Sequence, residues 1–223
     1  MMQLYIANKN YSTWSMRPWL VLHAFNLPIQ EILIPFSEEA DGGAFKQQML
    51  ALHANGKVPL LQHDGVMIWD SLAICEYLAE QFQELPLWPK DATQRAWGAR
   101  SICAEMHSSF MQLRSLCSMN LQADYGRHGQ RLWSEHAELR AEVARIEQIW
   151  SNRAAVDGFL CGEFSIADAF FAPVVTRLQT FQLPVSDNTQ RYMQKILQHP
   201  SVVEWITAAQ LEQPVRRMEQ YPR

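Results

Sequence analysis

The chain has 223 residues, of which 48% are hydrophobic and 19% are charged, and its formal net charge is −4. This is the composition of an ordinary globular protein, and the length suffices for one large domain or two modest ones. Acidic and basic residues are interspersed, so no basic patch indicates nucleic-acid binding. No apolar run approaches the roughly 20 residues that a membrane-spanning helix needs.

The N-terminal segment MMQLYIANKNYS lacks a basic stretch followed by a long apolar one, so it does not resemble a secretory signal. The cysteines are widely scattered and form no C-x-x-C pair; they are Cys75, Cys103, Cys117 and Cys161. This spacing predicts buried free thiols in a reducing compartment. We therefore expect a cytoplasmic protein.

The first elements alternate between strand and helix. Residues 4–7 predict a strand. Pro18 is tolerated only in the first turn of a helix, so the next helix must begin near residues 14–16, and it continues to about Phe25. A second strand is expected over residues 29–34. A second helix is expected over residues 44–52, after Asp41-Gly42-Gly43.

Residues 56–78, GKVPLLQHDGVMIWDSLAICEYL, are the most informative stretch. Two apolar runs flank Asp64-Gly65, a dipeptide that suits a tight hairpin because glycine accepts positive φ without a Cβ clash. Pro59 argues for an edge strand, a strand start or a cis bond. Asp70-Ser71 is a candidate helix N-cap. The order β-α-β-α-β-β-α implies a parallel crossover and then an antiparallel hairpin.

After a Pro-bracketed connector at residues 85–90, the pattern is helical throughout. Two apolar faces at helical spacing predict two long helices, separated by residues 124–129; they are Ile102, Met106, Phe110 and Leu113, and Leu139, Val143, Ile146 and Trp150. Short helices are expected over residues 190–198 and 202–211, split by His199-Pro200.

The sequence G-x-x-x-S-I-A-D-A contains Ser165 and, three residues later, Asp168. This is a variant of the capping box, in which each side chain can accept a hydrogen bond from a free backbone N–H of the other residue's turn. The helix that follows, from residue 166 to about residue 181, is almost wholly apolar in its early turns. We expect it to form the buried centre of a second domain, with a structural role for both capping residues.

Two motifs resemble those of a known family. The first motif resembles the glutathione-binding half of cytosolic glutathione transferases; it consists of K-V-P-x-L, a short hairpin and then [DE]-S-x-A-I-x-x-Y-L. The second motif, G-x-x-x-S-I-A-D-A, resembles the folding motif of their C-terminal domain. The resemblance spans nearly the whole chain. It implies a thioredoxin-like α/β domain over residues 1–84, a linker over 85–90 and an all-α helical domain over 91–223.

The loop after the first strand has the spacing S-x-x-x-x-R, which is similar to the serine-type zeta and tau classes. The resemblance implies that Ser12 activates the glutathione sulfur. A hydroxyl that donates a hydrogen bond to sulfur favours the thiolate, and a helix N-terminus adds partial positive charge. Thr13-Trp14 replaces a serine and a cysteine of the zeta class, which counts against isomerase activity of that kind.

Other residues compete for the donor role. Tyr11 ranks second and Thr13 third, whereas Tyr5 falls in the middle of a strand, where a core or sheet-face position is expected. Alternatively, one of the serines or Thr13 in this loop simply caps the helix. No cysteine occupies the loop, which argues against thiol-disulfide exchange.

The remaining glutathione contacts are also implied by the resemblance. The backbone of Val58, before a cis Pro59, would pair with the cysteinyl backbone of the tripeptide. Asp70 would bind the γ-glutamyl ammonium, and Ser71, with its helix N-terminus, would bind the γ-glutamyl carboxylate. Lys57 would lie near the glycyl carboxylate, with a solvated lysine as the alternative.

The electrophile pocket is predicted from Trp14 and Phe110. The helix after Asp91 carries Met106, His107, Phe110 and Met111. A stripe of aromatic and methionine residues is more often core than pocket, and His107 as a general base is a hypothesis only. The seven histidines show no metal-binding spacing, and neither a serine-hydrolase nor a nucleotide-binding motif is found. We therefore expect no metal.

The overall prediction is a two-domain glutathione transferase with glutathione as co-substrate. Its thiolate would attack a small hydrophobic electrophile or a peroxide. The resemblance implies a homodimer, and neither nucleic acid nor a membrane is an expected partner. The alternative is a transferase-like module that binds glutathione or another protein without turnover, because fold alone does not determine activity.

Overall fold

The structure, a computed structural model, describes residues 1–39, 43–53 and 55–222. Its first half contains, in chain order, β1 (Met2–Ile6), α1 (Thr13–Ala24), β2 (Ile29–Leu33), α2 (Gly43–Leu52), β3 (Leu60–His63), β4 (Val66–Trp69) and α3 (Ser71–Gln81). This is the predicted order, with boundaries shifted by up to two residues. Asp41 and Gly42, predicted to precede the second helix, lie outside the described residues.

The described strands form a four-stranded sheet in the order β2-β1-β3-β4. Strands β1 and β2 are parallel, and β3 is antiparallel to both β1 and β4. The predicted parallel crossover and hairpin are therefore confirmed. Asp64 and Gly65 connect β3 to β4 with φ of 48° and 83°, as a tight two-residue turn requires.

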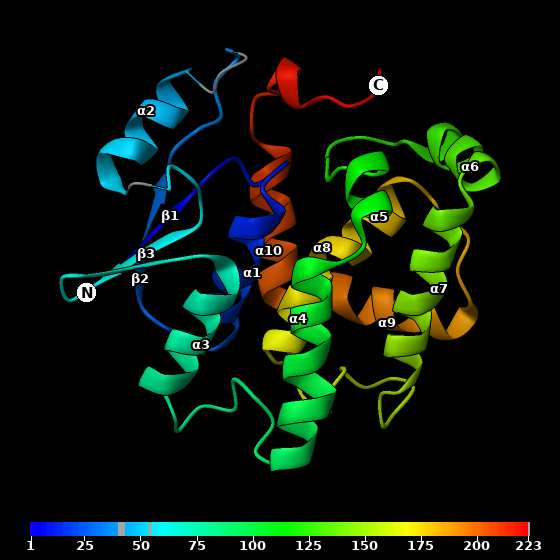
Figure 1. Cartoon of the computed structure of the whole chain (residues 1–223), viewed down its shortest axis with the longest axis horizontal. Helices are drawn as coiled ribbons and strands as arrows, with labels where there is room; N and C mark the ends of the chain where they lie inside the picture. The colour runs from blue at the N-terminus through cyan, green and yellow to red at the C-terminus, as the bar shows by residue number, and fades with distance from the viewer. Residues whose placement is uncertain (40–42, 54, 223) are drawn as a thin grey trace.

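Helix α1 lies between the sheet and the second half of the chain (Figure 1). One hydrophobic core crosses this boundary, because Leu4 of the sheet and Trp19 of α1 belong to the same buried cluster as Phe170 and Trp205. A smaller cluster lies where Met49 of α2 packs on the other sheet face. The N-terminus of α1 therefore faces the boundary between the two halves.

The second half is helical. A π-helical segment (Gln94–Arg100) continues into α4 (Ser101–Ser108), followed by α5 (Met111–Leu116), α6 (Gly126–Glu135), α7 (Ala137–Ser151), α8 (Ile166–Thr180), α9 (Asp187–Leu197), α10 (Pro200–Gln210) and a 3₁₀ turn (Arg216–Met218). Every residue of α8 from Ile166 to Leu178 is buried, and the predicted capping box is present. Among the described residues, none of these helices combines the length and apolarity needed to cross a membrane.

The prediction of one continuous helix through residues 102–113 is wrong. Helix α4 ends at Ser108, Phe110 adopts a left-handed backbone with φ of 61°, and α5 begins at Met111. The Arg114 side chain accounts for the break, because its guanidinium donates hydrogen bonds to three carbonyl groups at the end of α4. These carbonyls would otherwise lack partners.

The prediction that residues 124–129 separate two long helices is also wrong. Helix α6 begins at Gly126 and contains Gly129, and the break before α7 lies at His136. A Cβ atom at Gly129 would lie 1.7 Å from the carbonyl oxygen of Phe181. The glycine therefore permits close packing of α6 against the end of α8 and does not mark a loop.

The prediction for the cysteines is largely confirmed. Cys75, Cys103 and Cys117 are buried and Cys161 is partly buried, and all four are free thiols. Burial raises the pKa of Cys117 to about 12, and it also raises the pKa of the other three thiols. These side chains are therefore inert packing groups in this fold.

Candidate functional site

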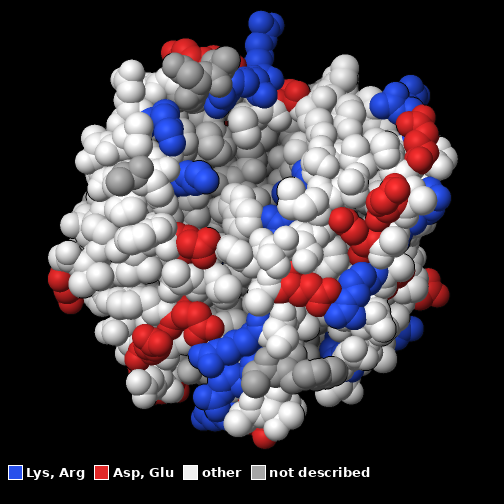
Figure 2. Space-filling model, in the orientation of Figure 1, with Lys and Arg blue, Asp and Glu red and all other residues white. Residues whose placement is uncertain are grey.

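Three segments of the first half meet at the boundary with the second half. A cavity of about 450 Å³ is lined there by Trp14, Asn55, Lys57, Val58, Pro59, Trp69, Asp70, Ser71 and His107. A second cavity, of about 310 Å³, shares three of these residues and is lined by Tyr11, Ser12, Thr13, Trp14, Phe36, Phe45, Lys57, Val58 and Met218. Figure 2 shows the molecular surface hollowed between the two halves. The predicted donor and glutathione residues thus surround two adjoining cavities.

Ser12 immediately precedes α1 and is 5% exposed. Its side chain does not cap the helix; its hydroxyl donates to Ser15 Oγ at 2.8 Å. Ser15 Oγ also accepts from the N–H of Ala7, so its own proton can rotate toward Ser12 and release the Ser12 hydroxyl for a ligand. A hydroxyl donor is therefore available beside the N-terminus of α1.

The alternative donors differ in their availability. The Tyr11 hydroxyl donates to Glu219 Oε1 at 2.6 Å and accepts from the N–H of Val215. The phenol is therefore engaged with the C-terminal segment, and burial together with the contact to Glu219 raises the pKa of Tyr11. Tyr5 donates to Gln62 in the sheet, as its mid-strand position predicted. Thr13 lines the same cavity as Ser12 and remains a competing donor.

The turn before β3 presents backbone groups to both cavities. The peptide bond between Val58 and Pro59 is cis, which confirms one of the options predicted for this proline. Val58 precedes β3, and within the described part of the chain its N–H donates no hydrogen bond. Lys57 is exposed and lines both cavities. An extended ligand backbone could pair with Val58 at this turn.

Asp70 is the N-cap of α3, as predicted. Its Oδ1 accepts from the N–H groups of Leu72 and Ala73, at 2.8 and 3.3 Å. Its Oδ2 lies 3.2 Å from His107 Nε2, and the Asp70 side chain is 42% exposed. One carboxylate oxygen therefore orients the helix while the other lies at the cavity.

Ser71 is the first residue of α3 and is 1% exposed. Its Oγ is buried and has no hydrogen-bond partner among the described residues, although the residue lines the larger cavity. A buried hydroxyl without a partner costs about 1–3 kcal/mol. A ligand carboxylate would satisfy it at the positive end of α3.

Positive charge lies behind the Trp14 side chain. Arg17 is 1% exposed, and its guanidinium lies 4.3 Å from the Trp14 ring centroid and 4.7 Å from that of Phe170. Its Nε and Nη1 have no partner among the described residues. Burial, together with the charges of Arg114 and Arg177, lowers the pKa of Arg17 to about 9. The cation persists at neutral pH and favours an anionic group nearby.

The predicted electrophile residues separate in the structure. Trp14 lines both cavities. Phe110 is buried in the hydrophobic core and lines neither, and Met106 is buried with it, whereas Met111 is exposed. His107 alone of this stripe reaches the cavity wall. The left-handed break at Phe110 redirects the stripe, so helical spacing could not predict which members reach the site.

Several lining residues were not predicted. Phe36, Phe45 and Met218 line the smaller cavity, and Asn55 and Trp69 line the larger one. Met218 comes from the end of the chain and carries no local signal. Arg17 lines neither cavity; it is the arginine of the S-x-x-x-x-R spacing, but that spacing could not show that its side chain is buried behind Trp14.

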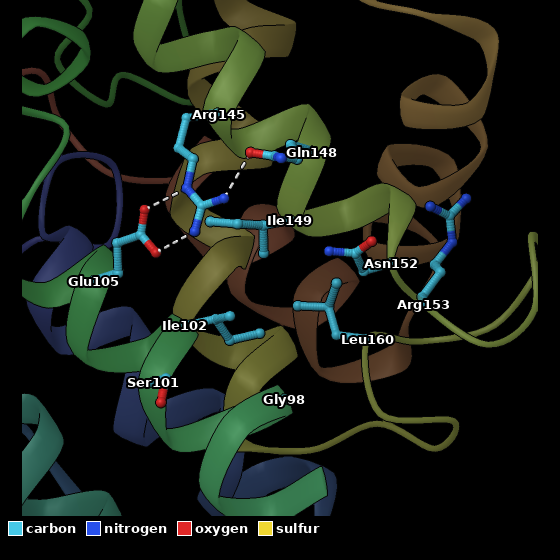
Figure 3. A pocket seen from close by; sticks show the side chains of 10 residues that line it. All are labelled: Gly98, Ser101, Ile102, Glu105, Arg145, Gln148, Ile149, Asn152, Arg153 and Leu160. Atoms are coloured by element: carbon cyan, nitrogen blue, oxygen red, sulfur yellow. Dashed lines mark hydrogen bonds and ion pairs between the residues drawn. The ribbon is translucent and has the colours of Figure 1, made fainter.

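A further cavity of about 270 Å³ lies between α4 and α7 (Figure 3). Its charged groups are already paired: Arg145 makes two hydrogen bonds to Glu105, at 2.7 and 2.8 Å, and another to Gln148. None of its described lining residues has a buried polar side-chain atom without a partner. We therefore assign this cavity no chemistry.

In the described ranges, no group of three or more histidine, cysteine or acidic side chains could hold a metal ion.

Comparisons with known proteins agree with the resemblance. A family model described as "Glutathione S-transferase, N-terminal domain" matches residues 11–81. Maleylacetoacetate isomerase of Rattus norvegicus is 30% identical over 186 residues, covering 82% of this chain and 81% of that protein. Glutathione S-transferase 1 of Dianthus caryophyllus is 29% identical over 178 residues, covering 78% and 76%.

Solved structures share the fold. The crystal structure of a glutathione transferase homolog from Burkholderia has 24% sequence identity and a TM-score of 0.66, and the match covers 93% of this chain and 97% of that one. The predicted architecture of a thioredoxin-like domain followed by a helical domain is confirmed by this likeness and by the observed sheet. Taken with the sequence relatives, it shows that the chain belongs to the glutathione S-transferase family.

Proposed function

We propose that this chain is a glutathione transferase in which Ser12 stabilises the glutathione thiolate for attack on a small electrophile or a peroxide. The observation that carries the proposal is the convergence of Ser12, Val58, Asp70 and Ser71 on adjoining cavities at the N-termini of α1 and α3. The Burkholderia structure carries bound glutathione, which supports the same ligand here. Of the two relatives named above, the Dianthus protein is a glutathione S-transferase and the Rattus protein is a maleylacetoacetate isomerase, and the similarity to both supports an enzyme.

The tripeptide fits the polar groups in order. Its γ-glutamyl ammonium would meet Asp70 Oδ2, and its α-carboxylate would accept hydrogen bonds from the Ser71 hydroxyl and from N–H groups at the start of α3. The cysteinyl backbone would pair with Val58, and the glycyl carboxylate would lie near Lys57. This orientation directs the sulfur toward Ser12, because Val58 and Lys57 line both cavities.

The chemical role of Ser12 follows from thiol acidity. A free thiol titrates near pH 8.5, so only a few per cent is thiolate at neutral pH. A hydrogen bond from Ser12 stabilises the thiolate without becoming a covalent link. The N-terminus of α1 and the buried Arg17 cation act in the same direction.

The electrophile would bind in the smaller cavity. Trp14, Phe36 and Phe45 provide aromatic rings, and Met218 adds an adaptable thioether.

We also propose that the protein is a cytoplasmic homodimer, as the family resemblance implies. Sedimentation at equilibrium should give twice the chain mass, and a single-chain mass would contradict the dimer.

The decisive experiment compares Ser12→Ala with the wild type. We expect the pKa of the bound glutathione thiol, followed by thiolate absorbance, to rise by about one unit, with little change in affinity. Thr13→Val is the matched control and should leave that pKa unchanged. A raised pKa in the control and an unchanged one in Ser12→Ala would transfer the donor role to Thr13. Retention on glutathione without conjugation or peroxidase activity would instead support the binding module.

A further inference from the structure

His107 brings a titratable side chain from the second half of the chain to the larger cavity. It lies near the end of α4, and its Nε2 is 3.2 Å from Asp70 Oδ2. The ring is edge-on to Trp14, with centroids 5.2 Å apart, and the side chain is 27% exposed. Its Nδ1 is buried without a hydrogen-bond partner among the described residues.

These contacts select one neutral form of the imidazole. A proton on Nε2 can be donated to Asp70. A proton on Nδ1 would instead be buried without an acceptor, and the lone pair of Nε2 would then face a lone pair of Asp70 Oδ2. Oδ1 accepts hydrogen bonds from Leu72 and Ala73 of α3, and His107 Nε2 of α4 makes a close contact with Oδ2, at 3.2 Å. The two carboxylate oxygens are therefore contacted from both halves of the molecule.

The groups around His107 favour this neutral form. Burial opposes the imidazolium most strongly, Asp70 at the start of α3 supports it, and Arg17 of α1 and Arg114 of α5 oppose it. Helix α8 contributes the uncharged ring of Phe170, 6.4 Å away between centroids. The net result is a pKa below the ordinary value of 6.5. The ring is therefore neutral at pH 7 and becomes charged only at a pH below 6.5.

We propose that His107 is a positioning residue of the glutathione site: its neutral form orients Asp70 for the γ-glutamyl ammonium, and its protonated form competes with that ammonium for the same carboxylate. This inference rests on the proposed function. Protonation places a positive charge 3.2 Å from Oδ2. The incoming ammonium then meets a carboxylate whose charge is already balanced, and it is repelled by the imidazolium. Proton and ligand therefore weaken each other's binding by the same factor.

The test uses S-methylglutathione, which keeps the γ-glutamyl group but has no titrating thiol. Calorimetric titration of the wild type from about pH 7.5 to about pH 5 should show affinity falling about tenfold. The fall should begin below pH 6.5, in the direction that the lowered pKa of His107 requires. Binding in this range should release protons to the buffer.

Two variants separate positioning from mere packing. His107→Gln can still donate to Asp70 but cannot titrate, so its affinity should lose the fall in acid. His63→Gln is the matched control, because His63 Nε2 also lies near an acid, 3.5 Å from Asp64, but lines neither cavity. It should keep the wild-type pH dependence. A structural role alone would shift affinity equally at every pH.

The outcomes distinguish the two proposals. Binding that is independent of pH in the wild type, or a pH dependence that survives in His107→Gln, overturns the role of His107 and leaves the proposed function intact. Absence of binding at any pH overturns the proposed function, and this inference with it. Nitrogen NMR of the His107 ring should show the proton on Nε2 at neutral pH; a proton on Nδ1 would contradict the positioning contact.

Discussion

Asp70 and Asp168 both stand at the start of a helix, α3 in the first half and α8 in the second. Asp168 is fully buried, and its carboxylate accepts from Leu160 N–H, from the N–H and hydroxyl of Ser165 and from the Tyr192 hydroxyl, all at 3.0–3.1 Å. Asp70 is partly exposed and directs one oxygen to a cavity. The same residue type thus stands in two different settings.

The difference lies in hydrogen-bond saturation. A carboxylate whose acceptor sites are filled from within the fold has nothing to offer a ligand, and its value is stability. Asp70 also adopts φ of 77°, a conformation that costs a non-glycine residue about 1–3 kcal/mol and that is typical of functional sites. The unsaturated, strained aspartate is therefore the candidate for binding, and the saturated one for folding.

Asp168→Ala should have the largest effect on stability. It leaves several buried donors without acceptors, so we expect the free energy of unfolding in urea to fall by about 3 kcal/mol or more. Asp70→Ala removes the N-cap interaction and the partly exposed contact with His107, and it should cost about 1 kcal/mol. Equal losses in the two variants would contradict the distinction between them.

The same contrast should appear in the pH dependence of stability. Burial raises the pKa of Asp168 to about 6, from an ordinary 3.8. Between these values the folded chain binds the proton and the unfolded chain does not, so this group's contribution to stability is full below about pH 3.8 and is lost as the pH rises through 6. The stability of the wild type relative to Asp168→Asn should therefore increase from pH 7 to pH 4.5. A constant difference would show that Asp168 titrates normally.

Much of the fold could be predicted because its signals are local. The capping box at Ser165, the N-cap at Asp70 and the turn at Asp64-Gly65 each depend on residues a few positions apart. The helix break at Phe110 could not be predicted in this way. It depends on how the Arg114 side chain folds back onto the preceding helix, which no apolar period encodes.

The candidate site divides in the same manner. Val58, Asp70 and Ser71 lie within one short stretch, so the motif alone predicts that they contribute to one site. Met218 and His107 reach the cavities from the second half of the chain, and the close contact of His107 with Asp70 depends on how the two halves pack. Tertiary packing also decided that Tyr11 is engaged by Glu219 while Ser12 is not.

The most direct test of the account is calorimetric titration of glutathione into Asp70→Asn at neutral pH. Asparagine is as good an N-cap as aspartate, so α3 should remain intact while the charge that faces the ammonium is lost. We predict that the dissociation constant rises about tenfold, which corresponds to about 1.4 kcal/mol, with unfolding unchanged. An unchanged dissociation constant would contradict the placement of the γ-glutamyl group at Asp70.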